Sequence, residues 1–551
     1  MKFINVISRS LSRIVFLSLI IFIALFARLN AQSNQKLDEQ IFSAIKKSTE
    51  FFAEKVSTNG GYLSHYLPDL SRRWGEMEAY PTMIWVQDPG TVSMGNTFLD
   101  VYEATNDEYY YEQAEKAAKA LVWGQLACGG WSYIIDFGGE KSLKKWYATY
   151  GKNAWRLEEF QHYYGNATFD DETTDGTAFF LLRFYLTKMD PAFKEPLDKT
   201  INFILKSQYP SGGWPQRYPL MHDFNKSGHP DYTSFYTFND NVVWENVEFL
   251  IVCYATLGEN KFLEPIRRGM YFYMLTQGAP PQAGWGQQYT LDLQLAGART
   301  YEPASYDPQY TAKHIELLIK FYKITGDKRF IAHIPDALNW LNSIKITNPK
   351  LPEGVYVFPK FVEPGTNKVL YTHREGSNVD CGHYYYDHDS SMPVIHYRNY
   401  REINLAQVEE EYQNVMKEDS AKVTEASPLK PGEVIEKSPL ERFHKILEYC
   451  EVPSLADENA IVSNRTLVEK IITSLDPEGR WLVKHEYTSN PYVGAPANCD
   501  DVHTKKYSTT YVGDQYDTSP FPDKSNQEYI STEAYSRNVH ILLDYLKSIK
   551  K

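Results

Sequence analysis

Two acidic segments of this sequence have residue types and spacing that could do chemistry. Asp170, Asp171 and Glu172 stand directly before an apolar run, and Asn239-Asp240-Asn241 stands before another. Each segment can begin a helix, because carboxylates favour the positive end of the helix dipole and Asp, Asn or Thr can cap it. The same carboxylates could instead bind a hard cation such as calcium, which takes several oxygen ligands. Both interpretations stay open at this point.

An arginine near an aromatic segment is the second feature. Arg299 lies in the segment Ala298-Arg299-Thr300-Tyr301-Glu302-Pro303, between two helical patterns, and it follows the segment Gly284-Trp285-Gly286-Gln287-Gln288-Tyr289. An aromatic platform beside a cation is typical of a site for an acidic sugar, because the ring packs on the sugar and the cation pairs with its carboxylate. A surface salt bridge is the alternative for Arg299, and packing between helices is the alternative for Trp285.

Further basic side chains lie between residues 358 and 376, where turn residues predict a long irregular loop. Lys360, Lys368 and Arg374 could neutralise the carboxylates of an acidic polymer, and long loops are often functional. The His- and Asp-rich stretch from His373 to His396 also contains Cys381. Its Cys-x-His and His-x-Asp order lacks the spacing of a structural zinc site.

A repeat indicates the elements that must position these residues. Gln125-x-x-x-Gly129-Gly130-Trp131 recurs as Gln208-x-x-x-Gly212-Gly213-Trp214, and more loosely as Gln277 followed by Gly284-Trp285. Each copy follows a segment with apolar residues at helical spacing, and we expect the double glycine to end that helix as its C-cap. Further helices are predicted at about 39–56, 93–105, 173–187, 240–256, 260–276, 308–324, 329–343, 403–416, 438–450, 463–475 and 531–548.

Repeats of this length mark arrays of supersecondary units. The predicted fold is therefore all-α, an (α/α) toroid or barrel of helical hairpins with long cleft-forming loops. In such an array the tryptophans would plug neighbouring hairpins, and the two acidic helix starts would lie side by side at one end.

Composition and the ends of the chain limit the function classes. Residues 1–31 resemble a secretory signal peptide, with Lys2, Arg9 and Arg13 before an apolar run and small residues near Ala31. We therefore expect cleavage near Ala31 and a secreted or periplasmic protein that leaves the membrane after cleavage; a retained membrane anchor is the alternative. The net charge of −13 argues against nucleic acid as a partner. Five scattered cysteines argue against a disulfide scaffold.

A proline-rich stretch near 425–438 suggests a domain boundary. We predict a toroid domain over 32–425 and a C-terminal helical extension over 426–551, which could pack on the same toroid.

Together these motifs resemble the pectate lyases of polysaccharide lyase family ten. The resemblance runs from Gln87 to about Tyr397. The motifs that carry it are Thr168 to Thr174, Gly213 to Pro219, Phe238 to Asn241, Gly284 to Tyr289, Ala298 to Pro303, and Thr366-Asn367-Lys368 ahead of Arg374-Glu375-Gly376. The resemblance implies a toroidal lyase, expected here as a monomer, that cleaves polygalacturonate by calcium-assisted β-elimination.

The resemblance also implies roles for single residues. Asp170, Asp171 and Asp240 would lie at the calcium site, and Arg299 would be the base that removes the C5 proton of a galacturonate. The residues expected to bind the substrate are Lys360, Arg374, Asn239, Trp285 and Gln288. Lys360 stands where the family usually has an arginine, so the charge is kept but the bidentate fork is lost. Because an arginine pKa lies above about 12, a metal-bound hydroxide is the alternative base.

Two other functions stay open. A glycoside hydrolase of the same fold would cleave a uronate-containing polysaccharide with two carboxylates and no metal. A non-catalytic glycan-binding protein of the cell envelope would bind the polymer without needing Arg299. Departures from the family pattern at Glu172, at Asp175 and in the segment 380–389 point to a modified or different uronate polymer.

Overall fold

The computed structural model describes residues 35–154, 157–220, 226, 228–376, 379, 382–394, 398–419, 422–430, 438–452, 463–484, 487–489, 520–522 and 527–550. The chain divides into two compact units, one of Met1–Ser57, Ile461–Val483 and Ala534–Lys551 and one of Thr58–Ala460 and Lys484–Glu533. The signal peptide predicted for residues 1–31 lies outside the described residues. None of the helices in the described ranges combines the length and the apolar character needed to cross a membrane.

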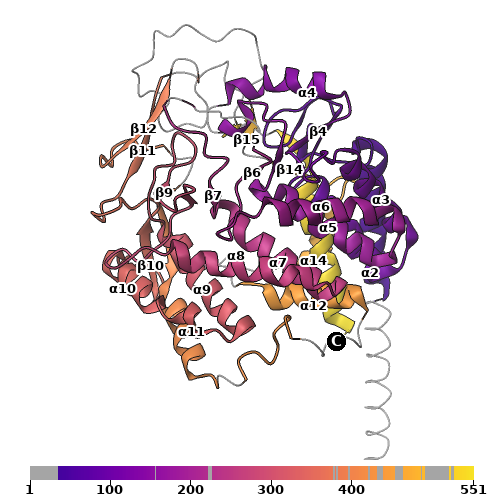
Figure 1. Cartoon of the computed structure of the whole chain (residues 1–551). Coiled ribbons are helices and arrows are strands. Elements are labelled where there is room, and N and C mark those ends of the chain that lie inside the picture. Colours follow the sequence, from indigo (N-terminus) through magenta and orange to yellow (C-terminus); the bar gives the residue numbers. More distant parts are fainter. Residues whose placement is uncertain are drawn as a thin grey trace, which may run out of the picture. The chain divides into compact units, whose positions relative to one another are not determined.

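The larger unit is built from helical hairpins (Figure 1). The paired helices are α2 (Thr91–Thr105) with α3 (Glu108–Trp123), α5 (Thr173–Lys188) with α6 (Lys194–Ser207), α7 (Val242–Leu257) with α8 (Leu263–Thr276), and α9 (Pro308–Thr325) with α10 (Ile334–Ile344). Helix α5 packs on both α2 and α7, α12 (Pro439–Cys450) packs on α5 and α7, and α11 (Leu405–Lys417) packs on α9. The predicted all-α class, an (α/α) toroid of helical hairpins, is confirmed.

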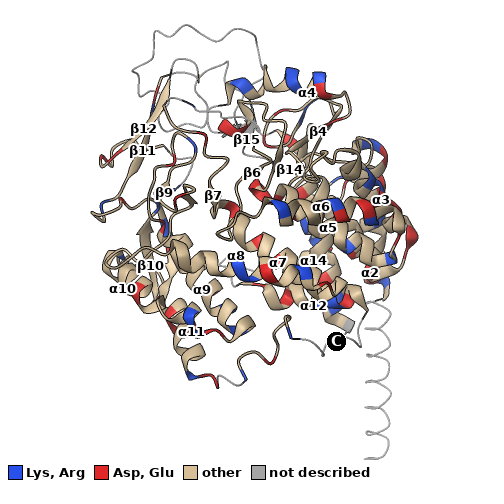
Figure 2. Ribbon diagram, viewed as in Figure 1, with Lys and Arg blue, Asp and Glu red and all other residues tan. Residues whose placement is uncertain are grey.

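Local sequence explains why these helices form where they do. In α3 the buried residues Tyr110, Ala114, Ala117 and Leu121 recur at three- or four-residue spacing, which gives one apolar face. Helices of the array carry side chains of both charges, as α3 and α12 show in Figure 2. One additional helix, α4 (Glu140–Tyr147), was not predicted; it buries only Trp146 and Tyr147 among its residues.

The repeated tryptophan packs each hairpin loop against the preceding helix. The indole nitrogen donates to a backbone carbonyl in Trp131 to Leu121 at 2.7 Å, Trp214 to Ile204 at 2.9 Å, and Trp285 to Tyr273 at 2.8 Å. All three side chains are fully buried. The prediction that these tryptophans plug the hairpin array is therefore confirmed.

The repeated glutamine joins each hairpin to the next one. Gln208 is itself the C-cap of α6, and its side-chain nitrogen donates to the carbonyls of Gly212 and Pro265, both at 2.9 Å. The prediction that the double glycine caps the helix was wrong. Gly212 instead has a φ of +110°, and a Cβ there would lie 2.1 Å from the Arg268 carbonyl oxygen of the next hairpin. Glycine is needed because the neighbouring helix approaches so closely.

The same contacts recur in the other two copies. Gln125 bonds to Gly129 and Pro196, and Gln277 bonds to Ala283 and His333. One side chain per loop thus holds two successive hairpins together.

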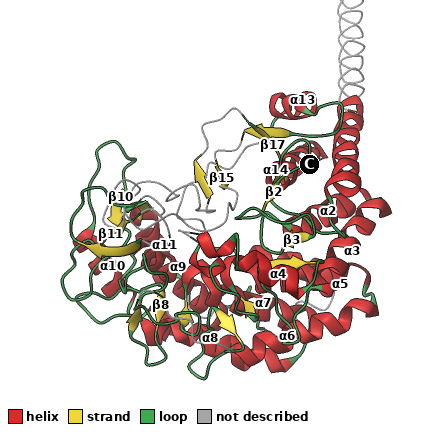
Figure 3. Cartoon of the chain, turned by 90° about the horizontal axis from the view of Figure 1, so that it is seen from above, coloured by secondary structure: helices red, strands yellow, loops and turns green. Residues whose placement is uncertain are grey.

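Short antiparallel strands lie among the loops, yellow beside the red helices in Figure 3. Strand β1 (His65–Tyr66) pairs with β2 (Arg73–Trp74) and with β17 (Glu528–Ser531), and β15 (Tyr487–Ser489) pairs with β16 (Pro520–Pro522). Strand β3 (Met83–Trp85) pairs with β4 (Ile134–Asp136), and β5 (Ala167–Thr168) pairs with β6 (Arg217–Tyr218). Strand β8 (Gln288–Tyr289) pairs with β7 (Tyr236–Thr237) and with β9 (Leu295–Ala296). Three of these pairs, β3 with β4, β5 with β6 and β7 with β8, join the loop before a hairpin to the loop after it.

Two longer strand pairs take up the two ends of the irregular segment predicted for residues 358–376, and residues 360–370 remain outside any strand. Strand β10 (Val355–Pro359) pairs with β13 (Tyr400–Asn404), and β11 (Tyr371–Glu375) pairs with β12 (His383–Asp387). The prediction was wrong only at these ends, because the β-branched and aromatic residues of the strand segments favour strands once a partner is available.

The smaller unit is helical. A helix over residues 35–51 continues into a π-helical turn at Phe52–Val56, and α13 (Arg465–Ser474), β14 (Leu482–Lys484) and α14 (Thr532–Lys550) supply further elements. Thr49 Oγ1 lies 2.7 Å from the Tyr535 hydroxyl. Trp481 donates to the Ile471 carbonyl at 2.9 Å, which repeats the tryptophan contact of the hairpins.

Three cysteines in the described ranges, Cys128, Cys253 and Cys450, are free thiols. Cys381 and Cys499 lie outside those ranges.

Candidate active site

Two short turns at the starts of α5 and α7 form the acidic part of the site. They are η4 (Asp170–Glu172) and η6 (Asn239–Asn241), and they contact each other, so the prediction that they lie side by side is confirmed. Asp171 and Asp240 have φ values of +46° and +49°, and the residues after them are also left-handed. Neither helix start has a side-chain cap hydrogen bond. The carboxylates are thus not used as caps, and strained backbone of this kind is concentrated at functional sites.

The three aspartates form one acidic cluster. Asp170 is buried, whereas Asp171 and Asp240 reach solvent in part. Enclosure by protein raises the pKa of Asp171 well above its usual range, and repulsion by Asp170 raises it further. Enclosure also raises the pKa of Asp240, and repulsion by Asp171 and then by Asp170, together with a hydrogen bond to Asp170, raises it further. Carboxyl groups this close cannot all ionise unless a cation balances them.

Two neighbours orient the cluster. The Tyr133 hydroxyl donates to Asp170 Oδ2 at 2.5 Å, and Gln87 Nε2 donates to Asp171 Oδ2 at 3.2 Å. Both neighbours come from loops at the hairpin end, so the cluster is assembled from three successive repeats.

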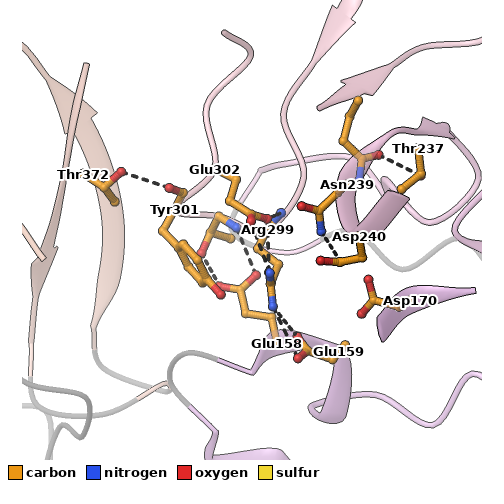
Figure 4. A network of polar contacts seen from close by, with 12 residues as sticks. Glu158, Glu159, Asp170, Thr237, Asn239, Asp240, Arg299, Tyr301, Glu302 and Thr372 are labelled. Carbon is orange, nitrogen blue, oxygen red and sulfur yellow. Dashed lines mark hydrogen bonds and ion pairs between the residues drawn. The ribbon is translucent and has the colours of Figure 1, made fainter. Parts of the chain in front are cut away.

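Arg299 lies beside the cluster and is held by two glutamates (Figure 4). Its Nε and Nη2 donate to the two carboxylate oxygens of Glu302 at 3.1 and 3.2 Å, and its Nη1 donates to Glu159 Oε2 at 3.3 Å. The side chain is only 13% exposed. A surface salt bridge, the alternative for this residue, is therefore wrong, because the pairs are enclosed and the bidentate fork fixes the guanidinium in one orientation.

Glu158 and Glu159, on the turn η3 (Glu158–Phe160), are site residues that no sequence motif indicated. Glu158 Oε2 accepts a hydrogen bond from the Thr300 backbone nitrogen at 3.0 Å, so this turn is bonded directly to the loop that carries Arg299. Burial raises the pKa of Glu159 to about 8 even though Arg299 lowers it. The only sequence signal was the pair of adjacent carboxylates itself.

The basic residues expected to bind substrate lie on neighbouring elements. Lys360 Nζ donates to Asp307 Oδ2 at 2.8 Å, and Gln287 Nε2 donates to the same oxygen at 2.6 Å. Arg374 is fully buried on β11, opposite Tyr384. Strand β11 is joined to the Arg299 loop because Thr372 Oγ1 donates to the Tyr301 carbonyl at 2.9 Å.

The remaining predicted substrate residues have contacts of different kinds. Asn239 donates to the neighbouring Asp240 carboxylate and accepts from the Tyr310 hydroxyl at 3.4 Å. Gln288 is buried on β8, where it accepts from Thr237 Oγ1 at 3.2 Å. Trp285 is enclosed in the hairpin array, as described above. The structure thus brings Asn239 to the acidic cluster, and it places Gln288 and Trp285 in contacts that stabilise the loops.

The donor set is chemically suited to a hard cation. Within the described part of the chain, no group of three or more His, Cys, Asp or Glu side chains is arranged as a ready-made metal site. Yet Asp170, Asp171 and Asp240 present carboxyl oxygens, the ligands that calcium prefers, and their mutual repulsion would be relieved by a cation. Glu76 and Glu159 add further negative charge beside the same cluster. The residues therefore fit calcium by charge and donor type.

Comparisons with known proteins place this geometry in context. The model of the pectic acid lyase family matches residues 137–414. No curated protein matches the chain. A solved family 10 polysaccharide lyase from Cellvibrio cellulosa is similar at 19% identity over 50% of this chain and 84% of that one, with a TM-score of 0.35.

Two further solved structures are similar to the chain. A mutant of a family 10 polysaccharide lyase from Cellvibrio cellulosa, in complex with trigalacturonic acid, matches at 18% identity over 50% of this chain and 85% of that one, with a TM-score of 0.33. An unsaturated glucuronyl hydrolase specific for heparin matches at 13% identity over 94% and 98% of the two chains, with a TM-score of 0.35.

Proposed function

This chain belongs to the pectic acid lyase family and is a polysaccharide lyase, and from that premise we propose that it cleaves polygalacturonate by calcium-assisted β-elimination. One observation carries the proposal beyond the family. Arg299 is clamped by Glu159 and Glu302 directly beside the three-aspartate cluster. A fixed cation next to a cation-binding carboxyl cluster suits a substrate whose reacting carbon carries a carboxylate.

Substrate binding requires positive charge, because each galacturonate carries a carboxylate and this protein is acidic. Arg374 and Lys360 are enclosed side chains, and Lys360 is paired with Asp307. They are therefore proposed to offset the charge of the uronates that flank the reacting sugar through their own positive charge, and not by direct contact. Asp170, Asp171 and Asp240 would hold calcium, which when bound would pair with the uronate carboxylate and make the adjacent C5–H more acidic. Asn239, hydrogen-bonded to Asp240, would help to hold that carboxyl group in place.

The proton transfer is assigned to Arg299. Elimination moves the C5 proton to a base, forms the C4–C5 double bond and breaks the C4–O bond, with the electron pair leaving on the glycosidic oxygen. Two carboxylates beside Arg299 favour its charged form, so the arginine must give up a proton before it can accept one. Glu159 lies 3.3 Å from Nη1, and its pKa of about 8 means that it is ionised and able to take up that proton at alkaline pH. The transfer is uphill, because the guanidinium pKa lies above about 12.

Incubation of the purified protein with polygalacturonate, with calcium or with a chelator, tests the proposal. The expected result is an unsaturated product that absorbs in the ultraviolet and forms only with calcium. New reducing ends without that absorbance would indicate the hydrolase alternative. Binding without cleavage at every pH from neutral to alkaline would indicate the glycan-binding alternative.

We also propose that residues 1–31 are removed during export and that the mature protein is a secreted or periplasmic monomer. The measurements are N-terminal sequencing of the protein recovered outside the cytoplasm and its molar mass by light scattering. An N-terminus at residue 1 would refute the export proposal, and a mass of twice the chain would refute the monomer.

A further inference from the structure

We propose that a pocket formed by the end of α3, β4 and the start of α4 binds an uncharged sugar ring. This proposal does not depend on the lyase reaction. The pocket has a volume of about 550 Å³, within the range of roughly 300–1,000 Å³ that is typical of small-molecule sites. Helix α4 packs beside β4, and both elements are labelled together in Figure 1.

An exposed tryptophan forms one wall of this pocket. Trp123, the last residue of α3, is 58% exposed. Its ring centroid lies 4.5 Å from that of Phe137, which supports the indole from one side. The hairpin tryptophans, by contrast, are enclosed by the helices they hold. A large aromatic face left open beside a pocket is a platform for the C–H face of a sugar, because such rings bury apolar surface without needing charge.

A buried hydrogen-bond acceptor forms the second feature. Asp136 lines the pocket, yet it is only 5% exposed. Its Oδ1 accepts from Thr82 Oγ1 at 2.6 Å and from the Gly138 backbone nitrogen at 2.8 Å. Its Oδ2 is buried without a hydrogen-bond partner in the described structure. Buried polar atoms are nearly always paired, so this oxygen points to a donor from outside the chain, such as a sugar hydroxyl.

Two other polar side chains of the wall, both amides, are already engaged within the protein. Gln125 Nε2 bonds to the next hairpin, and Asn166 Nδ2 donates to the Pro219 carbonyl at 2.9 Å. The Trp123 face is therefore the exposed group that a ligand would meet, whereas the Asp136 Oδ2 atom is itself buried and would bond to a ligand hydroxyl that enters the wall.

The charges of the pocket favour an uncharged sugar over a uronate. The described lining residues include the carboxyl groups of Asp136 and Glu140 but no Lys, Arg or His. Helix α4 carries residues of both signs (Figure 2), and Lys144 is bound to Glu140 Oε1 at 2.8 Å. A sugar carboxylate in this pocket would therefore face Asp136 without a lining cation. An uncharged ring can instead stack on Trp123 and donate a hydroxyl to Asp136.

Calorimetric titration of the full protein tests this assignment directly. The probes are the methyl pyranosides of glucose, galactose and xylose and a neutral linear tetrasaccharide of each sugar. We expect at least one probe to bind, and Trp123→Ala to weaken that binding about fivefold or more, since an aromatic contact of this kind contributes on the order of that factor. Asp136→Asn should weaken it as well. Leu275→Ala removes another exposed apolar side chain, 55% exposed on α8, and should leave the affinity unchanged.

Four outcomes would overturn the assignment. They are no binding by any probe, an unchanged affinity in Trp123→Ala, displacement of the neutral probe by trigalacturonate, and a calcium affinity that depends on Asp136. Because binding is measured without cleavage, a failure here is distinguishable from a failure of the lyase proposal. Trp123→Ala alters an exposed side chain, so it remains informative even if Asp136→Asn does not fold.

Discussion

Replacement of Arg299 by lysine separates the catalytic role of this residue from its positive charge. The guanidinium donates from Nε and Nη2 to Glu302 and from Nη1 to Glu159, so it holds two carboxylates at once. A lysine ammonium is a single donor centre, and it can keep only one of these partners in place. Arg299→Lys therefore keeps the charge but loses both the fork and the link to Glu159.

The size of the effect follows from these contacts. Loss of a positioned base lowers kcat by about 10²–10⁴-fold. KM should change far less, because calcium and the charges of Arg374 and Lys360, and not Arg299, are proposed to hold the substrate in the ground state. Loss of charge-assisted hydrogen bonds should lower the free energy of unfolding by roughly 1.5–3 kcal/mol, which leaves the protein folded.

The assay is the initial rate of unsaturated-product formation on polygalacturonate at saturating calcium, with urea unfolding measured on the same preparations. Arg329→Lys is the matched control, since Arg329 also forms a two-armed pair, with Asp327, but at an exposed position away from the site. A kcat within tenfold of the wild-type value in Arg299→Lys would refute the assignment of the base and leave the family membership intact.

Three further predictions concern protons. The rate should rise with pH through about 8, because Glu159 accepts a proton only when ionised, and Glu159→Gln should abolish that rise in the pH–rate profile. Calcium binding should release protons and weaken as pH falls, because Asp171 and Asp240 have raised pKa values and must ionise to bind the ion. Calorimetric titration in buffers of different ionisation enthalpy would detect the released protons. The same binding heat in every buffer would contradict this prediction. Burial raises the pKa of Glu316 to about 8, so the stability it contributes is complete below its unfolded pKa of about 4.5 and is lost as pH rises through 8. Between these two pKa values, the free energy of unfolding of Glu316→Gln should therefore rise relative to the wild type by up to about 1.4 kcal/mol per pH unit. Urea unfolding at several pH values measures this difference. An equal change in the exposed control Glu195→Gln would contradict the prediction.

The helices could be predicted from the sequence because their signals are local. Apolar spacing and the capping Asp307 mark α9 within a few residues of its observed bounds. Helix α4 has only two buried residues at its end, so its apolar pattern is too short to read. Strands β10 and β13 are far apart in the sequence, and each forms a strand because it hydrogen-bonds to the other. Pairing of this kind leaves no local pattern.

Some charged residues of the site could also be predicted, because they lie in local sequence motifs. Asp170, Asp240 and Arg299 stand in motifs with recognisable surroundings, and the repeat indicated that the first two would meet. Glu159 has no such surroundings, since its role comes from the distant Arg299 loop that folds against it. The positive φ of Asp171 was likewise not readable, because it arises from the turn between a strand and a helix start.

The glutamine and tryptophan contacts of the hairpins have a consequence for biosynthesis. A hairpin whose loop glutamine bonds to the following hairpin, as Gln208 does to Pro265, is incomplete until that later segment has left the ribosome. Each newly made hairpin would therefore supply the last hydrogen bond of the hairpin before it, and the hairpins would assemble in the order in which they are translated. A chain that stops after α8 would leave Gln277 without the His333 carbonyl it needs, so truncated products should be open at their last hairpin and susceptible to proteolysis there.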